Sequence, residues 1–86
     1  MTDINEVLEE RGARYGKFED HARISRGLKD VMMNEPGWDR LAPDQQEALD
    51  MTQHKIARII NGDPDYLDSW VDIVGYVQLV INRLSK

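Results

Sequence analysis

Apolar residues recur along the chain at spacings of three and four, which is the period of an amphipathic helix. Turn-forming residues interrupt this pattern at Gly12 and Gly16, at residues 34–37, and again at residues 61–64. The pattern therefore predicts four helices: one from residue 2 or 3 to the first two glycines, then residues 18–33, 43–61 and 64–84. No stretch alternates like a β-strand. We expect one all-α domain, residues 1–86, built as a compact helical bundle.

The last predicted helix is apolar on more than one side. Its main stripe runs from Trp70 through Val74 and Val77 to Leu84, and Trp70 is expected in the core. A helix of this kind is usually enclosed by several neighbours. In a chain of 86 residues the core is barely sufficient, so another subunit is expected to supply some of them. We therefore expect a dimer or a higher homo-oligomer.

Composition and charge narrow the class of protein. The chain is 41% hydrophobic and 31% charged, with a formal net charge of −5 and no cysteine. The negative charge argues against a general nucleic-acid binder and against binding to an anionic membrane, because both require a basic surface. The absence of cysteine excludes disulfides and thiolate metal sites. With no signal-like N-terminus and no run of transmembrane length, a cytoplasmic location is expected.

Two acidic pairs are the main candidates for chemistry. Glu47 and Asp50 lie three residues apart on one predicted helix, and Asp68 and Asp72 lie four apart on the next. If these helices pack antiparallel, the four carboxylates can face a shared cleft and bind Mg²⁺ or Mn²⁺, which prefer oxygen ligands. The alternative is a solvated acidic face that favours helix N-termini. Asp72 fits this alternative least, because apolar residues flank it within its helix.

Four basic residues are candidates for ligand binding. Lys55 and Arg58, with Arg14 and Arg11, are candidates for binding phosphate, for which arginine offers two parallel hydrogen bonds and lysine a point charge. The alternative is a set of ion pairs within single helices, each contributing little to stability.

Aromatic and histidine side chains are the remaining candidates for a functional site. Tyr15 and Trp38 either stack on a base or anchor the core or an interface. His54 is one helical turn from Asp50, so it is either an acid–base group or the half-exposed partner of an acid. His21 has no companion motif and is expected on the surface.

Three segments resemble a family of small phage and prophage proteins without an assigned function. They are an R-x-x-x-YG segment at residues 11–16, a KIAR segment at 55–58, and a DSWxDIxGY segment at 68–76. The resemblance covers most of the chain, roughly residues 11–79.

The layout of these segments is in turn similar to the MazG-like all-α nucleoside triphosphate pyrophosphatases, which bind Mg²⁺ with an E-x-x-E helix and an E-x-x-D helix. On this resemblance, Glu47 and Asp50 stand at the E-x-x-E pair and Asp72 at the last acid of E-x-x-D. The chain departs from the pattern at Ser69, where the family has glutamate, and the available acid is Asp68. The departure weakens metal binding in the family's geometry.

Two functions remain open at this point. In the first, a Mg²⁺-dependent nucleotide pyrophosphohydrolase uses Glu47, Asp50 and Asp72 in catalysis, while basic residues bind the phosphates. In the second, a non-catalytic phage protein acts against host defence, either by sequestering a nucleotide signal or by blocking a host protein. The first function is the main prediction, and the departure at Ser69 keeps the second open as its alternative.

Overall fold

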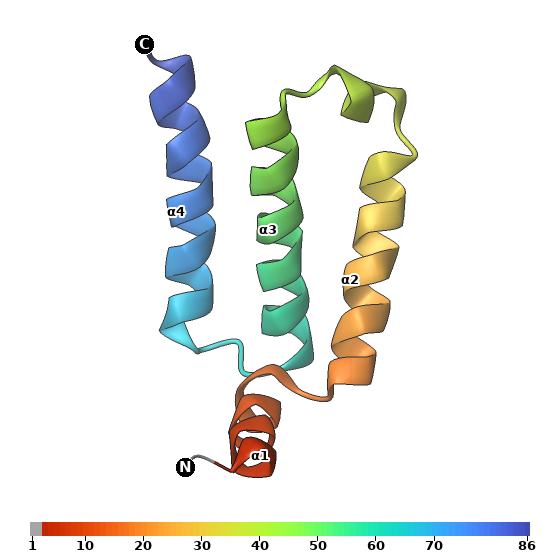
Figure 1. Ribbon diagram of the computed structural model, residues 1–86, viewed down its shortest axis with the longest axis vertical. Coiled ribbons are helices and arrows are strands. Elements are labelled where there is room, and N and C mark those ends of the chain that lie inside the picture. The colour runs from red at the N-terminus through yellow and green to blue at the C-terminus, as the bar shows by residue number, and fades with distance from the viewer. Residues whose placement is uncertain (1–2) are drawn as a thin grey trace.

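The computed structural model describes residues 3–86 as four α-helices and one 3-10 helix (Figure 1). The predicted start of the first helix at Thr2 lies outside the described residues. The described part of the chain contains no strand, and the prediction of an all-α bundle is confirmed. The elements are α1 (Ile4–Tyr15), α2 (Phe18–Met33), η1 (Pro36–Arg40), α3 (Pro43–Asn61) and α4 (Leu67–Leu84).

The three long helices form a single layer with α3 in the middle, and α1 lies across one end of it (Figure 1). Helix α3 packs against α2 on one side and α4 on the other. The molecule is consequently elongated, with extents of 44 × 28 × 26 Å. None of the described helices combines the length and the apolar character needed to span a membrane.

The start of the last helix differs from the prediction. Pro64 was expected at its first position, but α4 begins three residues later, at Leu67. The carboxylate of Asp63 accepts a hydrogen bond from the amide of Asp65 (2.9 Å), and its carbonyl accepts one from the amide of Tyr66 (3.3 Å). Asp63 therefore closes a turn instead of capping a helix.

The helices pack on one another through small and polar side chains. Ala48 and Ala57 are the only buried apolar residues of the described chain, whereas five buried residues are polar or charged. Between α2 and α3, the hydroxyl of Ser25 donates to the amide oxygen of Gln53 at 3.2 Å. Large apolar side chains lie mostly on the outside of the layer.

The expectation that Trp70 lies in the core is wrong. Its neighbour Ser69 is 2% exposed, so it is Ser69 that lies on the buried side of α4. One residue further along a helix the direction changes by about 100°, and Trp70 is 51% exposed. Its indole nitrogen donates to the carbonyl of Pro64 at 2.8 Å.

The connection between α1 and α2 crosses the end of α3 at very short range. The side-chain amide of Asn61 donates to the carbonyls of Tyr15 (2.8 Å) and Lys17 (2.9 Å). Gly16 has a φ of 78°, a conformation that glycine adopts readily. A side chain at Gly62 would approach backbone atoms of the other segment to about 2.1 Å, so only glycine fits there. We call Gly16, Asn61 and Gly62 the glycine crossing.

Replacing Gly62 with alanine should separate the two connections. We expect Gly62→Ala to lower the free energy of unfolding by about 2–4 kcal/mol, because the new methyl group must displace backbone atoms. Gly27→Ala is the control, since an added carbon at that position in α2 meets no atom within 4 Å. It should raise stability by about 0.5–1 kcal/mol. Urea unfolding measures both, and similar effects of the two variants would contradict the crossing.

Candidate functional site

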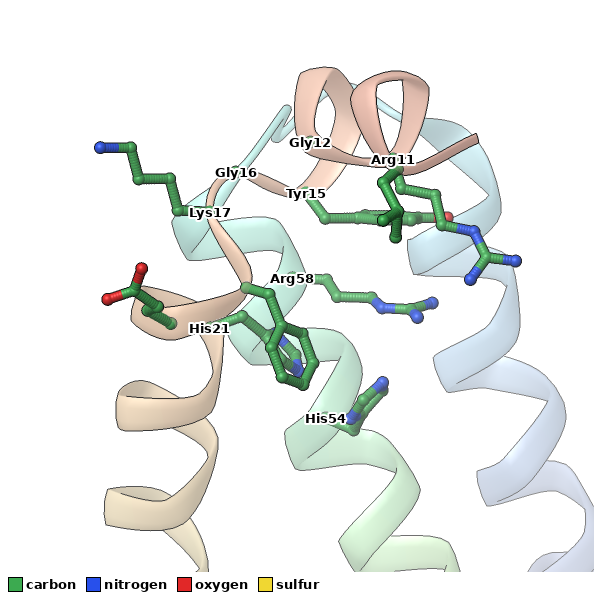
Figure 2. Close-up of a pocket in the computed structure, with 11 residues that line it drawn as sticks. Arg11, Gly12, Tyr15, Gly16, Lys17, His21, His54 and Arg58 are labelled. Carbon is green, nitrogen blue, oxygen red and sulfur yellow. The ribbon is translucent and has the colours of Figure 1, made fainter. Parts of the chain in front are cut away.

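A cleft of about 630 Å³ opens between α1, the start of α2 and the end of α3 (Figure 2). Its volume is in the range of pockets that bind small molecules. Gly16 of the glycine crossing and the neighbouring Lys17 both line the cleft, so the crossing supports one wall of it. The charged and ring-bearing side chains that line the cleft are three cations (Arg11, Lys17, Arg58), one acid (Glu19) and four rings (Tyr15, Phe18, His21, His54).

Tyr15 and Arg58, both predicted to bind substrate, lie against each other in the cleft. The guanidinium of Arg58 lies over the Tyr15 ring, 4.2 Å from its centre. The Tyr15 ring also packs edge-on against the ring of Tyr66, with the ring centres 6.0 Å apart. A cation over an aromatic face is held by the quadrupole of the ring. Arg58 is therefore positioned before any ligand arrives.

Arg14, the other arginine predicted to bind substrate, lies outside the residues that line the cleft. Its guanidinium pairs with Glu10 at 2.7 Å and donates to the hydroxyl of Tyr66 at 3.3 Å. Arg11 lies one helical turn before Arg14, and Arg11 is the one that lines the cleft. Arg11 and Tyr15 are four residues apart, which places them on the same face of α1.

Two histidines meet inside the cleft. The rings of His21 and His54 pack edge-on with their centres 4.6 Å apart. Burial, and then the charge of Arg58, lower the pKa of His54 to about 4 and also lower the pKa of His21. Both imidazoles are therefore neutral at pH 7. The expectation that His21 lies on the surface is wrong, since it is 6% exposed and its buried Nδ1 has no hydrogen-bond partner.

The two α4 carboxylates predicted to bind metal have partners within the chain. Asp72 accepts from the ammonium of Lys55 at 2.9 Å, and the Lys55 side chain is largely buried between α3 and α4. Lys55, predicted to bind substrate phosphate, is consequently not among the residues that line the cleft. Asp68 accepts from the hydroxyl of Tyr66 at 3.1 Å.

The two α3 carboxylates lie further along the bundle. Lys55 is level with Asp72, and Glu47 is eight residues earlier on α3, about 12 Å along the helix axis. Glu47 is exposed, and one oxygen of Asp50 is buried without a partner. Among residues 3–86 no three His, Asp or Glu side chains form a group that could hold a metal. The donor set of one chain therefore does not fit Mg²⁺ or Mn²⁺, and the metal site stays a prediction.

Trp38, the second aromatic residue considered for base stacking, lies in η1 at the opposite end of the layer from α1 (Figure 1). The cleft instead offers Phe18, which sequence reasoning did not select and which is 79% exposed. A signal for it was present in the sequence: Phe18 follows Tyr15, Gly16 and Lys17 directly. Where a glycine ends one helix and the next begins directly, the residues on either side of the glycine stay close in space.

A family model for a domain of unknown function, DUF6378, matches residues 1–83. The chain belongs to this family. The match spans the cleft, the glycine crossing and nearly all of α4. Neither a curated protein nor a solved structure matches the chain.

The pKa of His54 predicts how stability depends on pH. Because the pKa is lowered from 6.5 to about 4 on folding, the unfolded chain takes up this proton first as the pH falls. The contribution of neutral His54 is complete above pH 6.5 and is lost progressively between pH 6.5 and 4. Urea unfolding of wild type and His54→Gln measures it: the variant should show the shallower loss of stability over this interval. Equal slopes would show that His54 titrates normally.

Proposed function

We propose that the cleft binds a nucleotide or a nucleotide-derived phosphorylated molecule, and that the protein sequesters this ligand. The single observation that supports the proposal most is the composition of the cleft. Three cations and one acid line it, on a chain whose formal net charge is −5. A local positive charge on an acidic protein attracts an anionic ligand selectively and does not attract polyanions in general.

The phosphate would bind at the two arginines. Figure 2 shows the guanidinium groups of Arg11 and Arg58 extending to the same side of the cleft, whereas Lys17 extends to the other. Paired guanidiniums suit phosphate, because each offers two parallel donors. The charge of Arg58 already lowers the pKa of both cleft histidines, so the potential there is positive. The negative charge of a bound phosphate would offset this positive potential.

The base would bind at the exposed ring of Phe18. Within the described residues its ring stacks beside that of His21, whose centre is 6.1 Å away, and the side chain is 79% exposed. An exposed aromatic ring beside cations matches a ligand that carries both a flat ring and phosphates. Tyr15 is less suited to the base, because the Arg58 guanidinium already lies over its ring.

Hydrolysis of the ligand stays a prediction. It requires a divalent metal, and residues 3–86 bring together no group of three His, Asp or Glu side chains that could hold one. Sequestration requires affinity alone, which the cleft residues supply. Blocking of a host protein is a further prediction, which requires neither nucleotide affinity nor turnover.

Isothermal titration of nucleoside triphosphates and monophosphates, with and without Mg²⁺, tests the proposal. We expect binding that does not require the metal and no release of pyrophosphate in the same samples. Arg11→Gln should weaken binding roughly tenfold to a hundredfold, because it removes a charged hydrogen-bond donor from the phosphate. Arg26→Gln is the matched control: Arg26 is also exposed, lies on α2, and does not line the cleft.

The outcomes separate the candidate functions. Binding that depends on Mg²⁺, followed by pyrophosphate release, would replace sequestration with the pyrophosphohydrolase. Equal losses in Arg11→Gln and Arg26→Gln would show that the ligand binds elsewhere. The absence of any heat with the whole panel would overturn nucleotide binding and leave a protein partner as the function to examine.

A further inference from the structure

Helix α4 carries a continuous apolar stripe that no other part of the described chain covers. On α4, the side that packs on α3 includes Ser69, Asp72 and Tyr76. The large residues that follow one another along the exposed side are between 39% and 68% exposed. We call them the α4 stripe: Leu67, Trp70, Val74, Val77, Ile81 and Leu84.

The spacing of the α4 stripe is that of a helix–helix seam. Its members are separated by three, four, three, four and three residues, which is the heptad pattern of helices that pack along their length. No residue of the stripe is charged. The three charged residues of α4 (Asp68, Asp72 and Arg83) all lie away from it, because on a 100° wheel they fall on the opposite half of the helix.

The exposed apolar surface continues from α4 onto α3. Leu49 of α3 lines a second groove of about 230 Å³ together with Val77 and Ile81 of the α4 stripe. Ile56 and Ile60, which share the Leu49 side of α3, are also exposed. One face of the layer thus exposes apolar side chains from two helices in succession. Exposed apolar patches of this kind mark interaction sites.

The accessible surface of the whole chain can be compared with what a dimer buries. The accessible surface of the chain is 6486 Å², whereas a compact monomer of 10.0 kDa exposes about 5,200 Å². The excess is therefore roughly 1,250 Å². Obligate homodimers bury about 1,000–2,500 Å² on each partner. The radius of gyration agrees: it is 14.9 Å, against about 12 Å for a compact chain of this length.

We propose that a second copy of this chain covers the α4 stripe and the adjoining face of α3, giving a two-layered homodimer. A second copy fits the face because the stripe is uncharged, so two identical stripes meet without repulsion although each chain has a net charge of −5. The joined layers would supply the apolar core that one chain lacks. The glycine crossing and the candidate cleft use no residue of the stripe, so this proposal is independent of the proposed function.

Light scattering after size-exclusion chromatography tests the proposal on the purified chain. The wild type should elute with twice the 10.0 kDa mass of one chain. Val74→Glu should raise the dissociation constant of the dimer roughly a hundredfold or more, because it buries an unpaired charge in the seam. Leu79→Glu is the matched control: Leu79 is 67% exposed and Val74 is 66% exposed on the same helix, but Leu79 lies off the stripe. The control should remain a dimer.

A second pair of variants keeps the test decisive if Val74→Glu does not fold. The chain has no cysteine, so Val74→Cys introduces a single thiol at the middle of the stripe while keeping the side chain apolar. Mild oxidation should link Val74→Cys into a dimer and leave Leu79→Cys unlinked. A monomeric wild type would overturn the proposal, as would linkage of Leu79→Cys in place of Val74→Cys.

Discussion

The glycine crossing is the constraint on which the candidate site depends. Asn61 holds the carbonyls on both sides of Gly16, and the amide of Asp63 donates to the carbonyl of Arg14 at 2.6 Å. These bonds fix α1 across the end of the layer, although residues about 46 positions apart form them. Without the crossing, the Tyr15 ring would not lie against the guanidinium of Arg58, and the cleft would lose one wall. The hydrogen bonds at the crossing thus position the cation–π contact of the site.

Local signals in the sequence predicted most of the fold. Helical period and the turn-forming residues placed three of the helices closely. The predicted start of α4 at residue 64 was three residues too early, because Asp63 closes a turn there. The candidate site was predicted only in part. Tyr15 and Arg58 were selected, but His21 was not, because its burial comes from the packing of α2 on α3. The periodicity of a single segment cannot predict which residues of another helix will cover it.

The charges show why spacing alone did not identify the acidic site. Lys55 and Asp72 were assigned to different ligands from their types and positions, and in the fold they neutralise each other at 2.9 Å. The register of α3 against α4 decides this pairing. Glu47 lies eight residues before Lys55 on α3 itself, about 12 Å along the helix axis. The cleft at the α1 end of the molecule is instead lined by three cations and one acid. We therefore place the ligand in this basic cleft and not at the acidic stripes.

A nuclear magnetic resonance titration of the ¹⁵N-labelled protein with a nucleoside triphosphate, first without and then with Mg²⁺, tests this claim most directly. Amide shifts should concentrate at Gly12, Gly16, Lys17 and Arg58, and they should be present before the metal is added. Side-chain spectra should also show the pKa of His54 rising from about 4 when the anion binds. Shifts confined to the acidic residues of α3 and α4, or appearing only with Mg²⁺, would contradict this claim.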